Sequence, residues 1–112
     1  MKVLLVRPLL LNMLAITGAI DCEPLELEYL YTACREIGVE AVLYDGITET
    51  RPFSAVLRQE QPEVVAITGY ITQENRMRRY AELARLTLPA CQVVLGGVHA
   101  QLNARRLYFP TV

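Results

Sequence analysis

The stretch VVLGGVHA, residues 93–100, runs from three apolar residues into two adjacent glycines and then into the only histidine of the chain. An apolar run of this kind predicts a buried strand, whereas glycine weakens the interior of a strand. A pair of glycines therefore marks the place where a strand ends, or where another group comes close to the backbone. Which of the two applies depends on what the rest of the chain places beside Gly96 and Gly97.

Short apolar runs alternate with segments of helical periodicity along the chain. The apolar runs are KVLLV (2–6), EAVLYD (40–45), EVVAIT (63–68) and CQVVLGG (91–97). Apolar residues recur every three or four positions between these runs, which predicts helices near 24–37, 50–61 and 73–87 and the start of another in 98–107. Such alternation specifies a parallel sheet with helices on both faces. The sequence thus predicts a three-layer α/β fold, flavodoxin-like (Rossmann-like), with strand order 2-1-3-4 and a place for a fifth strand.

The same periodicity assigns an inner face to each helix. The expected inward residues are Leu27, Leu30, Tyr31, Cys34 and Ile37 in the first helix, Phe53, Val56 and Leu57 in the second, and Met77, Tyr80, Ala81, Ala84 and Leu86 in the third. Pro24 and Pro52 suit first helical turns, and Gly38 suits the position just past the first helix. A run of three arginines, Arg76, Arg78 and Arg79, forms the solvated face of the third helix or, alternatively, contacts a phosphate.

Composition is that of a single globular domain. The 112 residues are 53% hydrophobic and carry a formal net charge of -1. This charge gives no indication of a surface that binds nucleic acid. Three cysteines without metal-binding spacing predict buried thiols, no metal site and a cytoplasmic location; they are Cys22, Cys34 and Cys91. Arg7-Pro8 interrupts the apolar N-terminal run, which disfavours a secretory signal, and no segment reaches the roughly 18 apolar residues of a membrane span.

Ligands of an open parallel sheet bind beyond the carboxyl ends of the strands, where the strand order reverses. Gly69 and Gly96-Gly97 follow strand ends at that edge, so a ligand can lie against bare backbone; the alternative is that these glycines only turn the chain. The fingerprints G-x-G-x-x-G and G-x-x-x-x-G-K-[ST] are absent. The loop after the first strand (7–20) is long and apolar, which suits a large flat organic ligand or a neighbouring domain. Asp45 is predicted to form a turn; the less favoured alternative is that it binds the ribose of a nucleotide.

Several segments resemble the cobalamin-binding domain found ahead of the catalytic barrel in many radical S-adenosylmethionine enzymes. The resemblance covers nearly the whole chain. Its most specific pieces are PLELEYL (24–30), similar to the family's Pro-Leu-Gly-Leu-x-Tyr-Leu, and VVLGGVHA (93–100), similar to its Val-Val-x-Gly-Gly-Pro-His-Ala. Glu26 stands in the usual glycine position and Val98 in the usual proline position, and neither change removes the glycines at the strand ends.

The resemblance implies cofactor-binding roles in three loops. The segment Thr68-Gly69-Tyr70 would contact the buried nucleotide tail of cobalamin, and Gly96-Gly97-Val98-His99 would line the slot of that tail. The first loop would face the lower side of the corrin ring with Arg7, Pro8, Leu9 and Asn12. Relatives that ligate cobalt carry Asp-x-His-x-x-Gly there, and this loop has no histidine. The resemblance therefore implies base-off cobalamin without a histidine ligand.

The role of His99 stays open between three interpretations. A hydrogen bond to the cofactor tail or to the following helix is favoured over a surface role and over metal ligation. No residue of the chain is expected to be catalytic, because the Cys-x-x-x-Cys-x-x-Cys motif of an iron–sulfur cluster and a paired nucleophile for the histidine are both missing from the sequence.

These observations predict one domain, residues 1–112, of a longer polypeptide that is cut before or within a fifth strand. The resemblance implies a downstream radical barrel as partner, with S-adenosylmethionine and a [4Fe-4S] cluster, and a small-molecule substrate for methyl transfer or ring chemistry. One alternative is a docking domain without a cofactor. Another is a receiver-like domain, which is disfavoured because Arg7-Pro8 and Thr68-Gly69 stand where acidic residues are needed.

Overall fold

In the part of the chain that the structure describes, four parallel strands form one sheet, and helices connect them. The computed structural model describes residues 1–8, 25–46, 49–68 and 74–96. The elements are β1 (Lys2–Arg7), α2 (Leu25–Glu36), β2 (Glu40–Asp45), α3 (Phe53–Glu60), β3 (Val64–Thr68), α4 (Glu74–Thr87) and β4 (Gln92–Gly96). The strand order is β2-β1-β3-β4 with every pairing parallel, which confirms the predicted fold class.

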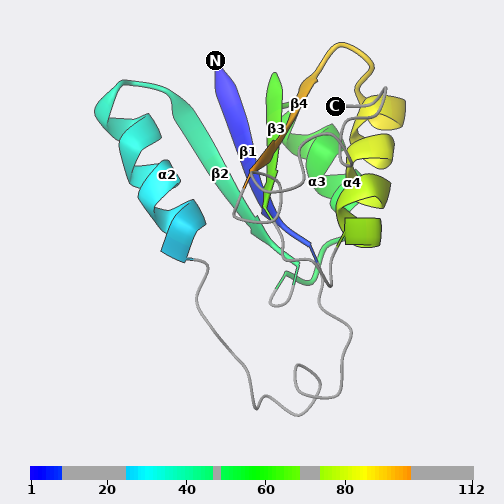
Figure 1. Ribbon diagram of the computed structural model, residues 1–112. Coiled ribbons are helices and arrows are strands. Elements are labelled where there is room, and N and C mark those ends of the chain that lie inside the picture. Colours follow the sequence, from blue (N-terminus) through cyan, green and yellow to red (C-terminus); the bar gives the residue numbers. More distant parts are fainter. Residues whose placement is uncertain (9–24, 47–48, 69–73, 97–112) are drawn as a thin grey trace.

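The helices cover the two faces of the sheet unequally. Figure 1 shows α2 on one side and α3 and α4 on the other. This split follows from right-handed crossovers, since the chain first steps from β1 to β2 and then reverses direction to reach β3 and β4. The larger core lies under α3 and α4, while the core under α2 has three buried members among the described residues, Val3, Leu5 and Leu27.

The central strand β1 is the most deeply buried element. Its side chains alternate between the two faces, with Val3 and Leu5 under α2 and Leu4 and Val6 in the larger core. All four are buried, which explains why this strand is a continuous apolar run rather than an alternating one.

Helices α3 and α4 pack largely as the periodicity predicts. Phe53, Val56 and Leu57 are the buried residues of α3, and Met77, Ala81 and Ala84 are buried in α4, with Tyr80 partly buried. The expected inward position of Leu86 is wrong, because that side chain is 80% exposed. Nine residues separate it from Met77, and at about 100° per residue this places the two on opposite sides of the helix.

Helix α2 packs through a narrower face than expected. Leu27 is buried, and Tyr31 and Cys34 are half-buried. Leu30 is 49% exposed and Ile37 is 76% exposed, so the prediction that these two side chains face inward is wrong. Ile37 lies beyond the last turn of the helix, and Gly38 reverses the chain there with a φ of +78°. Leu30 borders a groove instead of the core.

Candidate functional site

The carboxyl ends of all four strands meet at one edge of the sheet. On the face that carries α2, the side-chain alternation brings the last residues into a row across the sheet, in the order Asp45, Arg7, Thr68, Gly96. Thr68 and Gly96 are paired in the register of β3 and β4, and Val6 pairs with Ile67 one residue before the end of β1. The predicted neighbourhood of the third and fourth strand ends is therefore present in the described residues.

A small apolar groove opens beside this row, between α2 and the last residues of β3 and β4. Its volume is about 120 Å³, and its lining residues are Leu27, Leu30, Ala66, Ile67, Thr68, Val94 and Gly96. None of these residues is charged, and Thr68 supplies the one side-chain hydroxyl. Ligand pockets usually have volumes of about 300–1,000 Å³, so this groove can hold one ring or one arm of a ligand rather than a whole cofactor.

Gly96 is placed where a side chain would enter open space. A Cβ built on it meets no heavy atom of the described residues within 4 Å, and its φ lies outside the left-handed region. Neither backbone conformation nor the packing of the described residues therefore requires a glycine at this position. Room left beside bare backbone at the end of a strand is what an approaching ligand needs.

Arg7 has a protein partner at this edge. Its guanidinium donates two hydrogen bonds to the carboxylate of Asp45, at 2.9 and 2.6 Å. The next residue, Pro8, is buried. Asp45 also accepts a hydrogen bond from Glu49 N at its backbone oxygen, as a turn residue does. Of the other predicted site residues, those outside the described ranges are Leu9, Asn12, Gly69, Tyr70, Gly97, Val98 and His99.

The sequence did not predict five of the residues that line the groove: Leu27, Leu30, Ala66, Ile67 and Val94. The alternation within β4 contained a usable signal, because Gln92, Val94 and Gly96 share one face and Val94 is 49% exposed in the middle of a strand. An apolar side chain so exposed on an otherwise buried sheet indicates either a groove or a covering group.

Among the described residues, the titratable groups with shifted pKa values lie outside the groove. Burial raises the pKa of Tyr44 to about 12, and its hydroxyl donates to the carbonyl of Arg51 at 3.1 Å. Hydrogen bonds from Arg51 hold the pKa of Glu49 at about 2. Burial also raises the pKa of the Cys91 thiol. These shifts belong to the surroundings of α3 and α4, whereas the described walls of the groove contain no titratable side chain.

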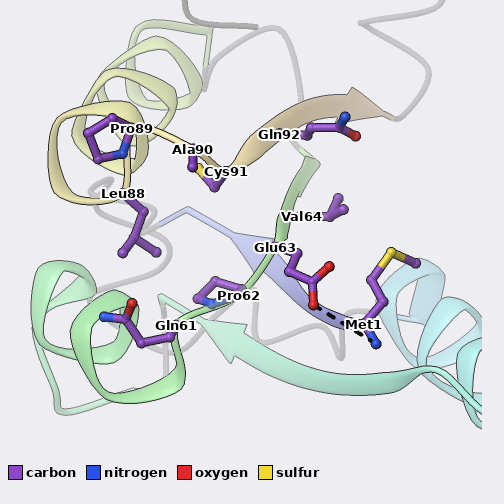
Figure 2. A pocket seen from close by; sticks show the side chains of 10 residues that line it. All are labelled: Met1, Gln61, Pro62, Glu63, Val64, Leu88, Pro89, Ala90, Cys91 and Gln92. Carbon is purple, nitrogen blue, oxygen red and sulfur yellow. Dashed lines mark ion pairs between the residues drawn. The ribbon is translucent and has the colours of Figure 1, made fainter.

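A larger hollow of about 460 Å³ lies at the opposite, amino edge of the sheet. Figure 2 shows Met1, Glu63 and Gln92 around it, with the Met1 amino group 4.0 Å from a carboxylate oxygen of Glu63. Open parallel sheets bind ligands at the carboxyl edge, so the smaller groove is the better candidate despite its size. Among the described residues, no group of three His, Cys, Asp or Glu side chains is arranged to hold a metal ion.

A parallel, doubly wound sheet with an apolar groove at the ends of its third and fourth strands defines the class of α/β ligand-binding domains. The chain belongs to the B12-binding domain family, whose model matches residues 11–111. Membership of this family supports cobalamin binding. No curated protein matches the chain. In the described part of the chain, no helix has the length and apolar character needed to cross a membrane.

Proposed function

We propose that the chain binds cobalamin and holds one part of its nucleotide tail in the groove between α2 and the ends of β3 and β4. The observation that carries this proposal is the open space beside Gly96, in a member of the B12-binding domain family. The groove fits a flat, uncharged ring, because its described walls contain no charged side chain to attract or repel a phosphate.

Helix α2 and the sheet would contact the ligand ring from opposite sides of the groove. Leu27 and Leu30 of α2 would contact one side of the ring, while Ala66 and Val94 would contact the other side from the sheet. Thr68 would supply a hydroxyl at the mouth. The contacts that the family resemblance implies in the remaining loops stay part of the proposal; these residues are Leu9, Asn12, Gly69, Tyr70, Gly97, Val98 and His99.

We further propose that cobalamin is bound base-off and without a histidine on cobalt. The only histidine of the chain is His99, and residues 8–24 contain none. Bound cobalamin would supply a cobalt centre for methyl transfer or ring chemistry. The downstream radical barrel, its S-adenosylmethionine, its [4Fe-4S] cluster and the cytoplasmic location belong to the same proposal and rest on the family resemblance. A three-cysteine cluster in the sequence after Val112 would support that part.

The experiment mixes the purified chain with hydroxocobalamin, removes free ligand by desalting and records the absorption spectrum. We expect retained colour with a base-off spectrum, and we expect Gly96→Leu to abolish retention because the new side chain fills the groove. Gln92→Leu is the matched control, since it adds the same side chain to the same face of β4 about 13 Å away. Colourless wild-type protein would instead favour a docking domain without cofactor, and retention by Gly96→Leu would show that the slot lies elsewhere.

A further inference from the structure

The side chains of Arg7 and Asp45 form a two-pronged ion pair at the carboxyl ends of β1 and β2. Arg7 Nε donates to Oδ1 of Asp45 at 2.9 Å and Arg7 Nη2 donates to Oδ2 at 2.6 Å. The two side chains are only 11% and 15% exposed. Paired, charge-assisted hydrogen bonds of this geometry fix the relative position of the two groups more firmly than a single contact does.

Two backbone hydrogen bonds lie beside this ion pair, and we call the group of Arg7, Asp45, Gly46 and Glu49 the corner. Arg7 and Asp45 are the last partners in the register of β1 and β2. Gly46 N donates to the backbone oxygen of Arg7 at 2.7 Å, and Glu49 N donates to the backbone oxygen of Asp45 at 2.8 Å. The chain therefore leaves both strands from points that the ion pair and the backbone hold together.

This corner adjoins the candidate cofactor groove. Arg7 and Thr68 occupy neighbouring places in the row at the strand ends, because Val6 pairs with Ile67 one residue earlier. Thr68 in turn pairs with Gly96, and both line the groove. The end of β1 therefore lies beside the strand that carries one wall of the groove.

We propose that Arg7 and Asp45 are a positioning pair for the cofactor groove and act without contacting the cofactor. The pair holds the end of β1 against β2, and β1 in turn holds the end of β3 where Thr68 meets the ligand. Asp45 also neutralises a guanidinium that would otherwise attract an anion to the mouth of an apolar groove. The proposal rests on the proposed cobalamin binding and gives Arg7 a different role from the direct contact that the family resemblance implies.

The test compares release of bound hydroxocobalamin from the wild-type chain and from Asp45→Ala and Arg7→Lys. We expect each variant to release it faster, on the order of 10-fold. Metal sites lose affinity by a similar factor when the residues that orient their ligands are mutated. Lysine keeps the charge but cannot make the two-pronged contact. If Arg7 instead bound an anionic group of the cofactor, Asp45→Ala would remove a carboxylate that competes with that group for the guanidinium, and the release would be slower. Slower or unchanged release from Asp45→Ala would therefore overturn the proposal.

The matched control is Glu60→Gln, which removes the hydrogen-bonded ion pair with Lys2, 3.1 Å long, at the other end of β1. We expect it to lower the melting temperature without changing the release rate. An equal change in release from this control would mean that both variants act through global stability, which would also overturn the proposal.

A second measurement does not depend on the cofactor. Amide hydrogen exchange at Gly46, whose N–H is bonded to the backbone oxygen of Arg7, should become faster in Asp45→Ala. If the wild-type chain retains no cobalamin, the proposed function fails, while this exchange still reports on the corner. Unchanged exchange at Gly46 would refute the positioning role on its own.

Discussion

Gly96 is the residue on which the site assignment depends. Its backbone conformation is open to other residues and the described neighbours leave the space beside it empty. Among the described residues, neither the φ of Gly96 nor its packing requires a glycine, which leaves room for a ligand beside the backbone. Thr68, its partner in the strand register, adds a hydroxyl to the same position along the edge.

The two described cysteines differ in their surroundings, and we expect different reactivity. Cys91 is 2% exposed, its Sγ donates to the carbonyl of Ala84 at 3.7 Å, and burial raises the pKa of its thiol. Because the thiolate is the reactive form, Cys91 should resist alkylation in the folded chain, while the half-buried Cys34 is modified. Peptide mass spectrometry after a short exposure to iodoacetamide would measure both, and equal labelling would contradict the structure.

Single residues set a limit to what the sequence could predict. The glycine pair and the strand before it predicted a site at the carboxyl edge of the sheet, and the register shows that Thr68 and Gly96 are neighbours at that edge. Leu30 and Val94 were not predicted as groove residues, because an apolar side chain has the same sequence signal whether it packs in a core or lines a groove. Their exposure depends on where α2 lies over the sheet, which is a tertiary property.

Helix α4 offers a direct comparison between a core residue and an exposed one. Met77 is fully buried and Leu86 is 80% exposed. We expect Met77→Ala to lower the free energy of unfolding by about 3 kcal/mol, because it leaves a cavity in the core. We expect Leu86→Ala to change it by less than about 0.5 kcal/mol. Urea unfolding followed by circular dichroism measures both. A comparable loss of unfolding free energy in Leu86→Ala would contradict the observed orientation of α4 on the sheet.

The connection between β2 and α3 should make stability depend on acid pH. Hydrogen bonds from the Arg51 side chain and backbone lower the pKa of Glu49 from 4.5 to about 2. The folded state therefore binds this proton less readily than the unfolded state, so the contribution is present above pH 4.5 and is lost as pH falls towards 2. Urea unfolding at a series of pH values should show a shallower acid slope in Glu49→Gln and in Arg51→Met. Wild-type slopes in both variants would contradict the assigned hydrogen bonds.

The elements themselves were largely predictable because residues with strong conformational preferences mark their ends. Pro52 precedes α3 directly, Gly38 follows α2, and β2 spans the predicted residues Glu40–Asp45. The inner face of α2 was only partly predictable. Apolar spacing shows which residues share a stripe, but the width of the stripe that meets the sheet depends on the neighbours of the helix.

At the scale of the whole molecule, alternation and handedness narrowed the strand order to a few arrangements, and a flavodoxin-like fold was the one predicted. Right-handed crossovers restrict a β-α-β-α-β-α-β chain to few arrangements, and β2-β1-β3-β4 is one of them. The groove was harder to predict, since it is formed by α2, β3 and β4, which are distant in sequence. The sequence predicted a site at one edge of the sheet and a class of ligand, and the structure shows which described residues line a groove at that edge.

Methyl NMR of the chain with and without cobalamin tests the central claim most directly. If the nucleotide tail enters the groove, adding cobalamin should shift the methyl signals of Ala66 and Val94, and nuclear Overhauser effects should connect these methyls to aromatic protons of the ligand. Shifts confined to Val64 and Leu88, which line the hollow at the amino edge, would contradict the claim, and so would unchanged spectra.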